Sequence, residues 1–321
     1  PMSHTESLQQ LQLQLESVIV GQKKLLERLI IAVLAGGHIL LEGPPGLAKT
    51  TAVHALATGI NADFHRIQFT PDLMPSDLTG SEIYQPENGN FHFSPGPIFN
   101  QIVLADELNR APPKVQSALL EAMAEQQVTV GNHTHALNEF FIVLATQNPL
   151  EQFGTYPLPE ALLDRFLFKY LLDYPSLDEE VEIARRARQD DKGHLEAVVK
   201  AQLTPTDVLI LRQQVNKVFV EPSIENYAVR LVSATRKLAS IHSDWGDLVK
   251  TGSSPRGSIA LLRAAMARAF FLQRDYVIPE DIIELAPEVL RHRLILDFSA
   301  EAEGVSADDI IQLLLNKVEA P

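Results

Sequence analysis

The 321-residue sequence carries 27 basic and 41 acidic side chains, giving a net charge of −14, and it contains no cysteine. This acidity argues against sequence-independent binding of nucleic acid, which needs many basic contacts to phosphate. The lack of cysteine excludes disulfides and thiolate metal sites and fits a reducing, cytoplasmic location, and no apolar run is long enough to span a bilayer.

The first half of the chain alternates short apolar runs with helical or loop segments. Residues 8–19 and 23–34 favour helices, separated by a break at Val20, Gly21 and Gln22. Near-continuous apolar runs, typical of strands buried on both faces, occur at 38–41, 64–69, 102–106, 140–146 and 168–172. This alternation predicts an α/β fold with a parallel sheet.

Two inserts interrupt this rhythm, and each is predicted to form a hairpin that projects from the sheet. The first pairs residues 81–84 with 91–94 through the strong turn signal Asn88-Gly89, and the second spans 128–137. Phe91 and Phe93 share a face of the first hairpin, so they could contact a client protein or pack inward. His133 and His135 in the second hairpin lack the converging ligands that a metal site needs.

The second half of the chain is predicted to be helical and to form a separate domain. Helical patterns cover residues 179–188, 205–217, 223–240, 258–272 and 280–291. We therefore divide the chain into an α/β domain at residues 1–190, a polar linker at 191–204 and an all-helical domain at 205–321. The basic run at 185–188 follows several acidic residues and is interpreted as a solvated helix face.

A glycine-containing loop follows the first apolar strand and is a candidate phosphate-binding site. Its backbone N–H groups can surround phosphate oxygens, Lys49 can reach the β- and γ-phosphates, and the Thr50 hydroxyl can bind Mg²⁺. The helix that opens at Thr50 would present its N-terminus to the phosphates. Ala48 occupies a position where glycine is usual. The candidate binding residues are Gly43, Pro44, Pro45, Gly46, Leu47, Ala48, Lys49, Thr50 and Thr51.

Polar residues follow two of the predicted buried strands. Asp106 could hold Mg²⁺ and Glu107 could orient or deprotonate a water molecule, although the same pair could cap a helix. Asn148 would lie at the carboxyl edge of the sheet, where α/β folds bind ligands, and could hold that water. A turn-forming role before Pro149 is compatible with this assignment.

Two arginines could stabilise negative charge on transferring phosphoryl oxygens. Arg165 ends a predicted helix just before the last strand, and Arg256 begins a helix in the second domain. Structural salt bridges are the alternative role for both residues.

In combination, these motifs resemble those of the MoxR subgroup of AAA+ ATPases. The resemblance covers the chain from about Val20 to Arg291. It rests on Gly46 to Thr50 with alanine at position 48, Asp106 to Ala111, Glu121 to Met123, Ala145 to Pro149, and Ser254 to Arg256. The main departure is Gly257, where a helix former is common.

The resemblance implies a five-stranded AAA+ core with helix-2 and pre-sensor-1 hairpin inserts and a helical lid. It implies that Lys49 and Thr50 are Walker A residues, that Asp106 and Glu107 are the Walker B pair, and that Asn148 is sensor 1. It further assigns Arg165 as arginine finger, Arg256 as sensor 2, Val20-Gly21-Gln22 as the adenine frame and Asn109-Arg110 as a sensor of the neighbouring subunit. Arg256 could act on its own nucleotide or on that of the adjacent subunit.

The function implied is MgATP hydrolysis by a ring, most often a hexamer, that remodels client proteins during maturation or metal insertion. A von Willebrand factor A-domain protein is the partner that the family implies. The alternatives are a ring ATPase directed at nucleic acid, which the net charge of −14 disfavours, and a nucleotide-gated binding module with little turnover, which the intact Glu107 disfavours.

Overall fold

The computed structural model describes residues 2–44, 49–149, 154–189 and 199–321. The chain forms two compact units, one comprising residues 1–33, 38–165 and 170–211, and the other 34–37, 166–169 and 212–321. Residues 191–198 of the predicted linker lie outside the described residues. At its described end the Gln202 N–H donates to the Gly59 carbonyl at 2.8 Å. The predicted boundaries at residues 190 and 205 stay a prediction.

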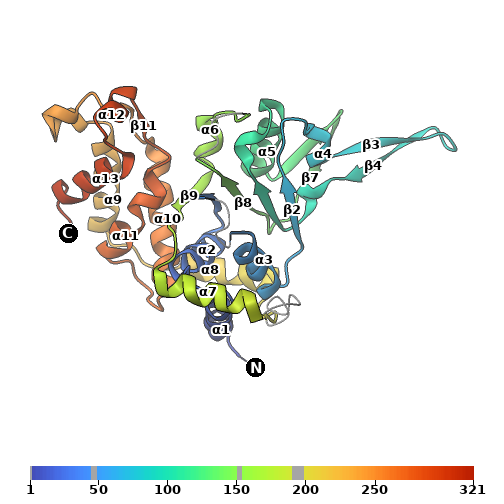
Figure 1. Cartoon of the computed structure of the whole chain (residues 1–321), viewed down its shortest axis with the longest axis horizontal. Coiled ribbons are helices and arrows are strands. Elements are labelled where there is room, and N and C mark those ends of the chain that lie inside the picture. Colours follow the sequence, from blue (N-terminus) through green and yellow to red (C-terminus); the bar gives the residue numbers. More distant parts are fainter. Residues whose placement is uncertain (1, 45–48, 150–153, 190–198) are drawn as a thin grey trace. The chain divides into compact units, whose positions relative to one another are not determined.

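A five-stranded sheet forms the centre of the α/β core, in the order β2-β5-β8-β1-β9 (Figure 1). The pairs β2–β5, β5–β8 and β1–β8 are parallel, as expected from the apolar runs. Every residue of β5 and β8 except the last is buried, which is why these strands lack polar alternation. The strands are β1 (His38–Glu42), β2 (Phe64–Gln68), β5 (Ile102–Asp106), β8 (Ile142–Gln147) and β9 (Phe166–Leu171).

The helices of the first half begin at residues suited to helix starts. Ser3 caps α1 through a reciprocal pair of hydrogen bonds with Glu6, and Pro113 opens α5. The predicted solvated face at 185–188 is confirmed, because Arg185 and Arg186 both pair with Glu182. These helices are α1 (His4–Val18), α2 (Lys23–Ala35), α3 (Lys49–Gly59), α4 (Pro75–Thr79), α5 (Pro113–Glu125), α6 (Glu160–Leu163) and α7 (Leu177–Gln189).

Both predicted hairpins are present, and they contact each other. The first pairs β3 (Gly80–Gln85) with β4 (Asn90–Pro95), and the second pairs β6 (Gln127–Val130) with β7 (His133–Ala136). His133 Nδ1 lies 2.7 Å from Glu82 Oε1, and the His135 ring stacks on Phe93 with centroids 3.8 Å apart. The first hairpin extends well beyond this contact, as Figure 1 shows.

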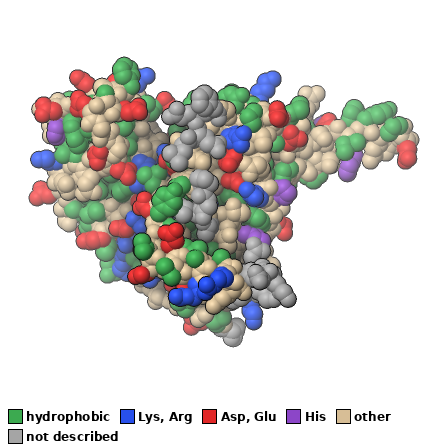
Figure 2. All heavy atoms as spheres, viewed as in Figure 1, with side chains coloured by type: hydrophobic (Ala, Val, Ile, Leu, Met, Phe, Trp, Pro, Cys, Tyr) green, Lys and Arg blue, Asp and Glu red, His purple; other side chains and the backbone are tan. Residues whose placement is uncertain are grey.

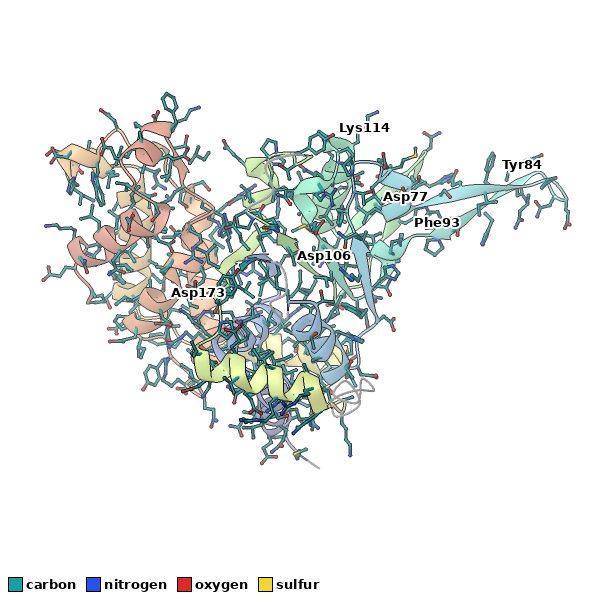
Figure 3. All side chains as sticks on the ribbon, in the orientation of Figure 1. Asp77, Tyr84, Phe93, Asp106, Lys114 and Asp173 are labelled. Carbon is teal, nitrogen blue, oxygen red and sulfur yellow. The ribbon has the colours of Figure 1, made fainter. Side chains whose placement is uncertain are left out.

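The two phenylalanines of the first hairpin have different environments. Phe93 packs inward against His135 and Phe99, whereas Phe91 is 66% exposed and contacts only the half-exposed Tyr84 among the aromatic side chains described. Tyr84 lies far out along the hairpin and Phe93 nearer its base (Figure 3). Apolar side chains are visible along the surface of this projecting arm in Figure 2. Phe93 therefore packs inward, whereas the prediction that Phe91 could contact a client protein stays a prediction.

The carboxy-terminal half is helical, as predicted, but it also contains a short antiparallel pair that the sequence analysis did not expect. That pair joins β10 (Val249–Thr251) to β11 (Ile295–Leu296). Among the described residues no helix is long and apolar enough to cross a membrane. The helices are α8 (Pro205–Val215), α9 (Pro222–Thr235), α10 (Pro255–Phe271), α11 (Pro279–Leu290), α12 (Phe298–Ala302) and α13 (Ala307–Lys317).

A buried carboxylate joins α10 to α11 within the second unit. Asp281 is 0% exposed, and its oxygens accept from Arg268 at 2.6 Å, from Arg274 at 2.6 and 2.9 Å, and from the Ile278 N–H at 2.9 Å. Hydrogen bonding to Asp281 raises the pKa of Arg274, so the guanidinium stays charged. A single carboxylate thus accepts hydrogen bonds from two guanidinium groups and one backbone N–H.

We expect Asp281→Ala to lower the free energy of unfolding by about 3–5 kcal/mol, because it leaves two partly buried guanidinium groups without their carboxylate. Urea unfolding followed by circular dichroism measures the loss. Glu280→Ala is the matched control, since Glu280 is exposed in the same first turn of α11, and it should cost at most about 1 kcal/mol. Equal losses for the two variants would contradict this assignment.

Candidate functional site

Two adjacent carboxylates stand at the carboxyl end of β5, next to the end of β8. The Thr146 hydroxyl donates to Asp106 Oδ1 at 2.5 Å and accepts from the Glu107 N–H at 3.0 Å. Asp106 lies at this edge of the sheet in Figure 3, and its side chain is 14% exposed. One buried hydroxyl therefore sets the positions of both acidic residues.

The backbone at Glu107 turns sharply to present the second carboxylate. Its φ of 56° and ψ of 51° place it in the left-handed region, which is costly for a residue with a long side chain. The Arg110 N–H donates to the Glu107 carbonyl at 3.0 Å, so the turn continues into the 3₁₀ helix Leu108–Arg110. Hydrogen bonds thus hold both the N–H and the carbonyl of the strained residue. Strained backbone of this kind is often found at active sites.

Each carboxylate also has an arginine partner. Arg66 of β2 donates to Asp106 Oδ2 through Nε at 3.0 Å and through Nη2 at 2.5 Å. Arg110 Nη1 donates to Glu107 Oε2 at 3.1 Å. Arg110, predicted to sense a neighbouring subunit, thus contacts the second carboxylate of its own chain.

Lys49 lies at the start of α3, beside this acidic pair. Its Nζ donates to the Gly43 carbonyl at 3.0 Å. Burial lowers the pKa of Lys49, while attraction to Asp106 and Glu107 opposes that shift. The predicted lysine and the two predicted carboxylates are therefore brought together.

The rest of the predicted phosphate loop is described only in part. Pro45, Gly46, Leu47 and Ala48 lie outside the described residues. Gly43 has a packing role as well, because an added Cβ would lie 2.8 Å from Leu172 Cβ. Thr50 and Thr51 occupy the first turn of α3, where an α-helix presents unpaired N–H groups.

The predicted adenine frame is a tight turn between α1 and α2. Gly21 has a φ of +78°, and an added Cβ would lie 2.8 Å from Glu179 Oε2 and 3.3 Å from Pro175 Cβ. Val20 is half-buried and Gln22 is buried. Gly21 therefore lies close to the segment that follows β9.

Asn148 lies where the sequence predicted it, immediately after β8. Its neighbour Gln147 pairs with Glu42, the last residue of β1, in the parallel ladder. Asn148 therefore lies at the end of β8, the strand between β5 with Asp106 and β1, which precedes the phosphate loop, and it is half-buried there. This is the edge of a parallel sheet at which α/β proteins bind ligands.

The two predicted arginines belong to different units. Arg165 is exposed just after α6, where its N–H donates to the Leu162 carbonyl at 3.1 Å. Arg256 is exposed in the first turn of α10, which Ser254 caps. The unusual Gly257 is explained by packing, because an added Cβ would collide with the Ser253 hydroxyl.

Sequence reasoning missed Arg66 and the role of Thr146. Thr146 lies in the motif Ala145 to Pro149, which the sequence analysis identified. A polar residue in an otherwise apolar buried strand was the signal that it has a hydrogen-bonding role. Arg66 was a charged residue inside a predicted strand, which is unusual unless it has a partner at the sheet edge.

The oxygen ligands offered here suit Mg²⁺. Asp106 supplies a carboxylate and Thr50 a hydroxyl, which are hard donors that leave room for phosphate oxygens and water. Within the described ranges no cluster of three or more His, Cys, Asp or Glu side chains could hold a metal by itself. The residues thus fit an ion that is bound together with a phosphate ligand.

Comparison with known proteins agrees with this geometry. Residues 38–168 match the ATPase family associated with various cellular activities (AAA), and residues 246–314 match an AAA lid domain. The chain is 48% identical to the uncharacterised protein YeaC of Bacillus subtilis, over 95% of this chain and 92% of YeaC. It is 45% identical to the chaperone MoxR1 of Mycobacterium tuberculosis, over 96% of this chain and 81% of MoxR1.

A solved structure has the same fold throughout. The crystal structure of a protein from Cytophaga hutchinsonii, provisionally named an ATPase, matches with a TM-score of 0.90 and 48% identity. The match covers 99% of this chain and 96% of that one.

We expect Thr146→Val to lower the free energy of unfolding by about 1–3 kcal/mol, because it leaves the Glu107 N–H and one Asp106 oxygen without a partner. Urea unfolding measures this change. The control is Thr58→Val, which removes an exposed hydroxyl bonded only to the His54 carbonyl among the contacts described. A loss no larger than that of the control would contradict the role assigned to Thr146.

Proposed function

The chain belongs to the MoxR group of AAA+ ATPases, and from this membership we propose that it hydrolyses MgATP to remodel client proteins. The observation that carries this proposal is the pair Asp106 and Glu107, fixed by Thr146 beside Lys49. A carboxylate pair at a strand end, next to a phosphate loop, can hold Mg²⁺ and orient a water molecule for phosphoryl transfer. The named chaperone among its relatives supports the remodelling role.

The residues of this chain divide the work of hydrolysis between them. Glu107 accepts a proton from a water molecule that attacks the γ-phosphate in line with the departing ADP, and Asn148 holds that water. Lys49 offers positive charge to the β- and γ-phosphates. Asp106 and Thr50 would hold Mg²⁺, which when bound neutralises charge on the phosphate oxygens.

The exposure of Arg165 supports a site that is shared between subunits. An arginine finger has to reach phosphate that its own loop does not hold, and a helix end on the surface permits this. We propose a homo-oligomeric ring, a hexamer by family analogy, in which Arg165 completes the neighbour's site. Arg256, exposed at the start of α10, is proposed to act as the second cation.

The client and the partner are inferred by analogy alone. We propose a von Willebrand factor A-domain protein as partner, and maturation of a client complex or metal insertion as the task. The absence of cysteine from the sequence supports the cytoplasm as the compartment. The acidic net charge supports a protein client over nucleic acid.

We expect Glu107→Gln to bind ATP about as tightly as the wild type while its turnover falls by about a hundredfold or more, because the amide cannot accept the proton. Binding is measured with a fluorescent ATP analogue and turnover by phosphate release. Lys49→Ala is the companion variant and should lose binding itself. Equal turnover by wild type and Glu107→Gln would refute the assignment of Glu107, whereas almost no turnover by the wild type itself would favour a nucleotide-gated binding module.

We expect mixed rings to recover activity that neither parent has. Arg165→Ala should lower turnover by about a hundredfold or more, since the arginine stabilises the transition state in trans. When Arg165→Ala subunits, which keep Glu107, are mixed with Glu107→Gln subunits, which keep Arg165, some sites contain both residues. Phosphate release by the mixture should exceed the mean of its separate components. A mixture equal to that mean would place Arg165 outside the neighbour's site.

A further inference from the structure

Both oxygens of the Asp106 carboxylate are engaged by the protein itself. Oδ1 accepts the Thr146 hydroxyl, and Oδ2 accepts two donors from one guanidinium, that of Arg66. Thr146 comes from β8 and Arg66 from β2, the strands on either side of β5. The carboxylate expected to help hold Mg²⁺ is thus already paired with a cation of the same chain.

The position of Arg66 allows this pairing to be temporary. β2 is one of the two edge strands of the sheet, and in its register with β5 Gln68 lies opposite Asp106. Arg66 precedes Gln68 by two residues, so both share a face, and Arg66 Nη2 donates to Gln68 Oε1 at 3.1 Å. The Arg66 side chain is 49% exposed, whereas that of Asp106 is 14% exposed. The guanidinium can therefore withdraw into solvent while the carboxylate stays in place.

The local charges explain why a cation is present here. Asp106 and Glu107 are neighbouring carboxylates, and repulsion between them would raise the free energy of the site without nearby positive charge. Lys49 attracts both, and Arg110 pairs with Glu107. Arg66 supplies the positive charge that compensates Asp106, and it donates to Oδ2, the oxygen that does not accept from Thr146.

We propose that Arg66 is a resident counter-ion of Asp106, a positioning residue that must yield Oδ2 when Mg²⁺ arrives with nucleotide. This inference rests on the proposed MgATP site and deepens it. Arg66 lowers the charge penalty for nucleotide phosphates when no metal is present, and it competes with Mg²⁺ when metal is present. It thereby weakens the dependence of nucleotide binding on Mg²⁺.

Removal of Arg66 is expected to weaken ADP binding without metal but not with metal. Without metal, Arg66→Ala should bind ADP more weakly, because two carboxylates then repel the phosphates with less compensation. With saturating Mg²⁺ it should bind ADP as tightly as the wild type or more tightly. The ratio of the Kd without metal to the Kd with metal should rise by about fivefold, the size expected of a half-exposed ion pair.

The test measures the Kd of a fluorescent ADP analogue in EDTA and in saturating Mg²⁺, with no turnover involved. Arg66→Lys keeps the charge and should give a ratio between those of the wild type and Arg66→Ala. Arg185→Ala is the matched control, because it removes an exposed arginine that pairs with Glu182 on α7, and its ratio should equal that of the wild type. A ratio for Arg66→Ala equal to or below that of the wild type overturns the inference.

Failure of the proposed function gives a different result. If the wild type binds the ADP analogue in neither condition, the proposed ATPase site is refuted, and the inference falls with it. If the wild type binds and only the Arg66 ratio is unchanged, the inference alone is overturned.

A second measurement tests the pair without any ligand. In thermal unfolding of the nucleotide-free protein, the Tm loss of Arg66→Ala combined with Asp106→Asn should be smaller than the sum of the two separate losses, because both changes remove one interaction. The conservative Arg66→Lys confirms that the fold tolerates replacement at this position. Additive losses would show that the two side chains are not coupled and would overturn the proposal.

Discussion

The hydrogen bonds of the Thr146 hydroxyl are the constraint on which the candidate site depends. Carboxylates at the end of a buried strand lose much of their hydration, and hydrogen-bond donors from the protein offset that loss. Thr146 donates to Asp106 at 2.5 Å, and by accepting from the Glu107 N–H at 3.0 Å it also fixes the backbone that carries the second carboxylate. Because β5 and β8 are adjacent and parallel, the contact follows from strand order alone.

Positive charge around the pair comes from three separate elements. Lys49 belongs to α3, Arg66 to β2 and Arg110 to the 3₁₀ helix after β5. Such a distribution lets each cation respond independently when phosphate or metal enters. A single buried cation would instead bind both carboxylates in one fixed arrangement, and its removal would cost far more than the loss of a half-exposed partner. The negative charge of the two carboxylates is therefore compensated without holding both of them in one fixed arrangement.

Much of the fold was predictable because its signals are local. The buried strands are continuous apolar runs, Asn88-Gly89 marks the first hairpin, and all five strands of the sheet were placed correctly. The individual helices after Arg291 were not placed, although Ser306 caps α13 and three of its apolar residues are buried. The pair β10–β11 was also missed, because strands of three and two residues have no periodicity to detect.

The candidate site residues also divide into those with a local sequence signal and those without one. Lys49, Asp106, Glu107 and Asn148 were predictable from strand ends and loop composition, which are properties of contiguous sequence. The Arg66–Asp106 pair joins residues 40 positions apart and depends on strand order, which one sequence does not specify. The inward packing of Phe93 likewise depends on a second hairpin that begins more than 30 residues later.

Glycine at the candidate site shows how packing and chemistry can demand the same residue. Gly43 belongs to the candidate phosphate loop, yet an added Cβ would collide with Leu172 whatever the loop binds. Gly257, which departs from the family pattern, is required by the nearby Ser253 hydroxyl next to the Ser254 cap that opens the helix of Arg256. A glycine beside a catalytic position is thus no proof of a phosphate contact. The case for the site rests instead on the polar side chains that the structure brings together, namely Lys49, Asp106, Glu107 and Thr146.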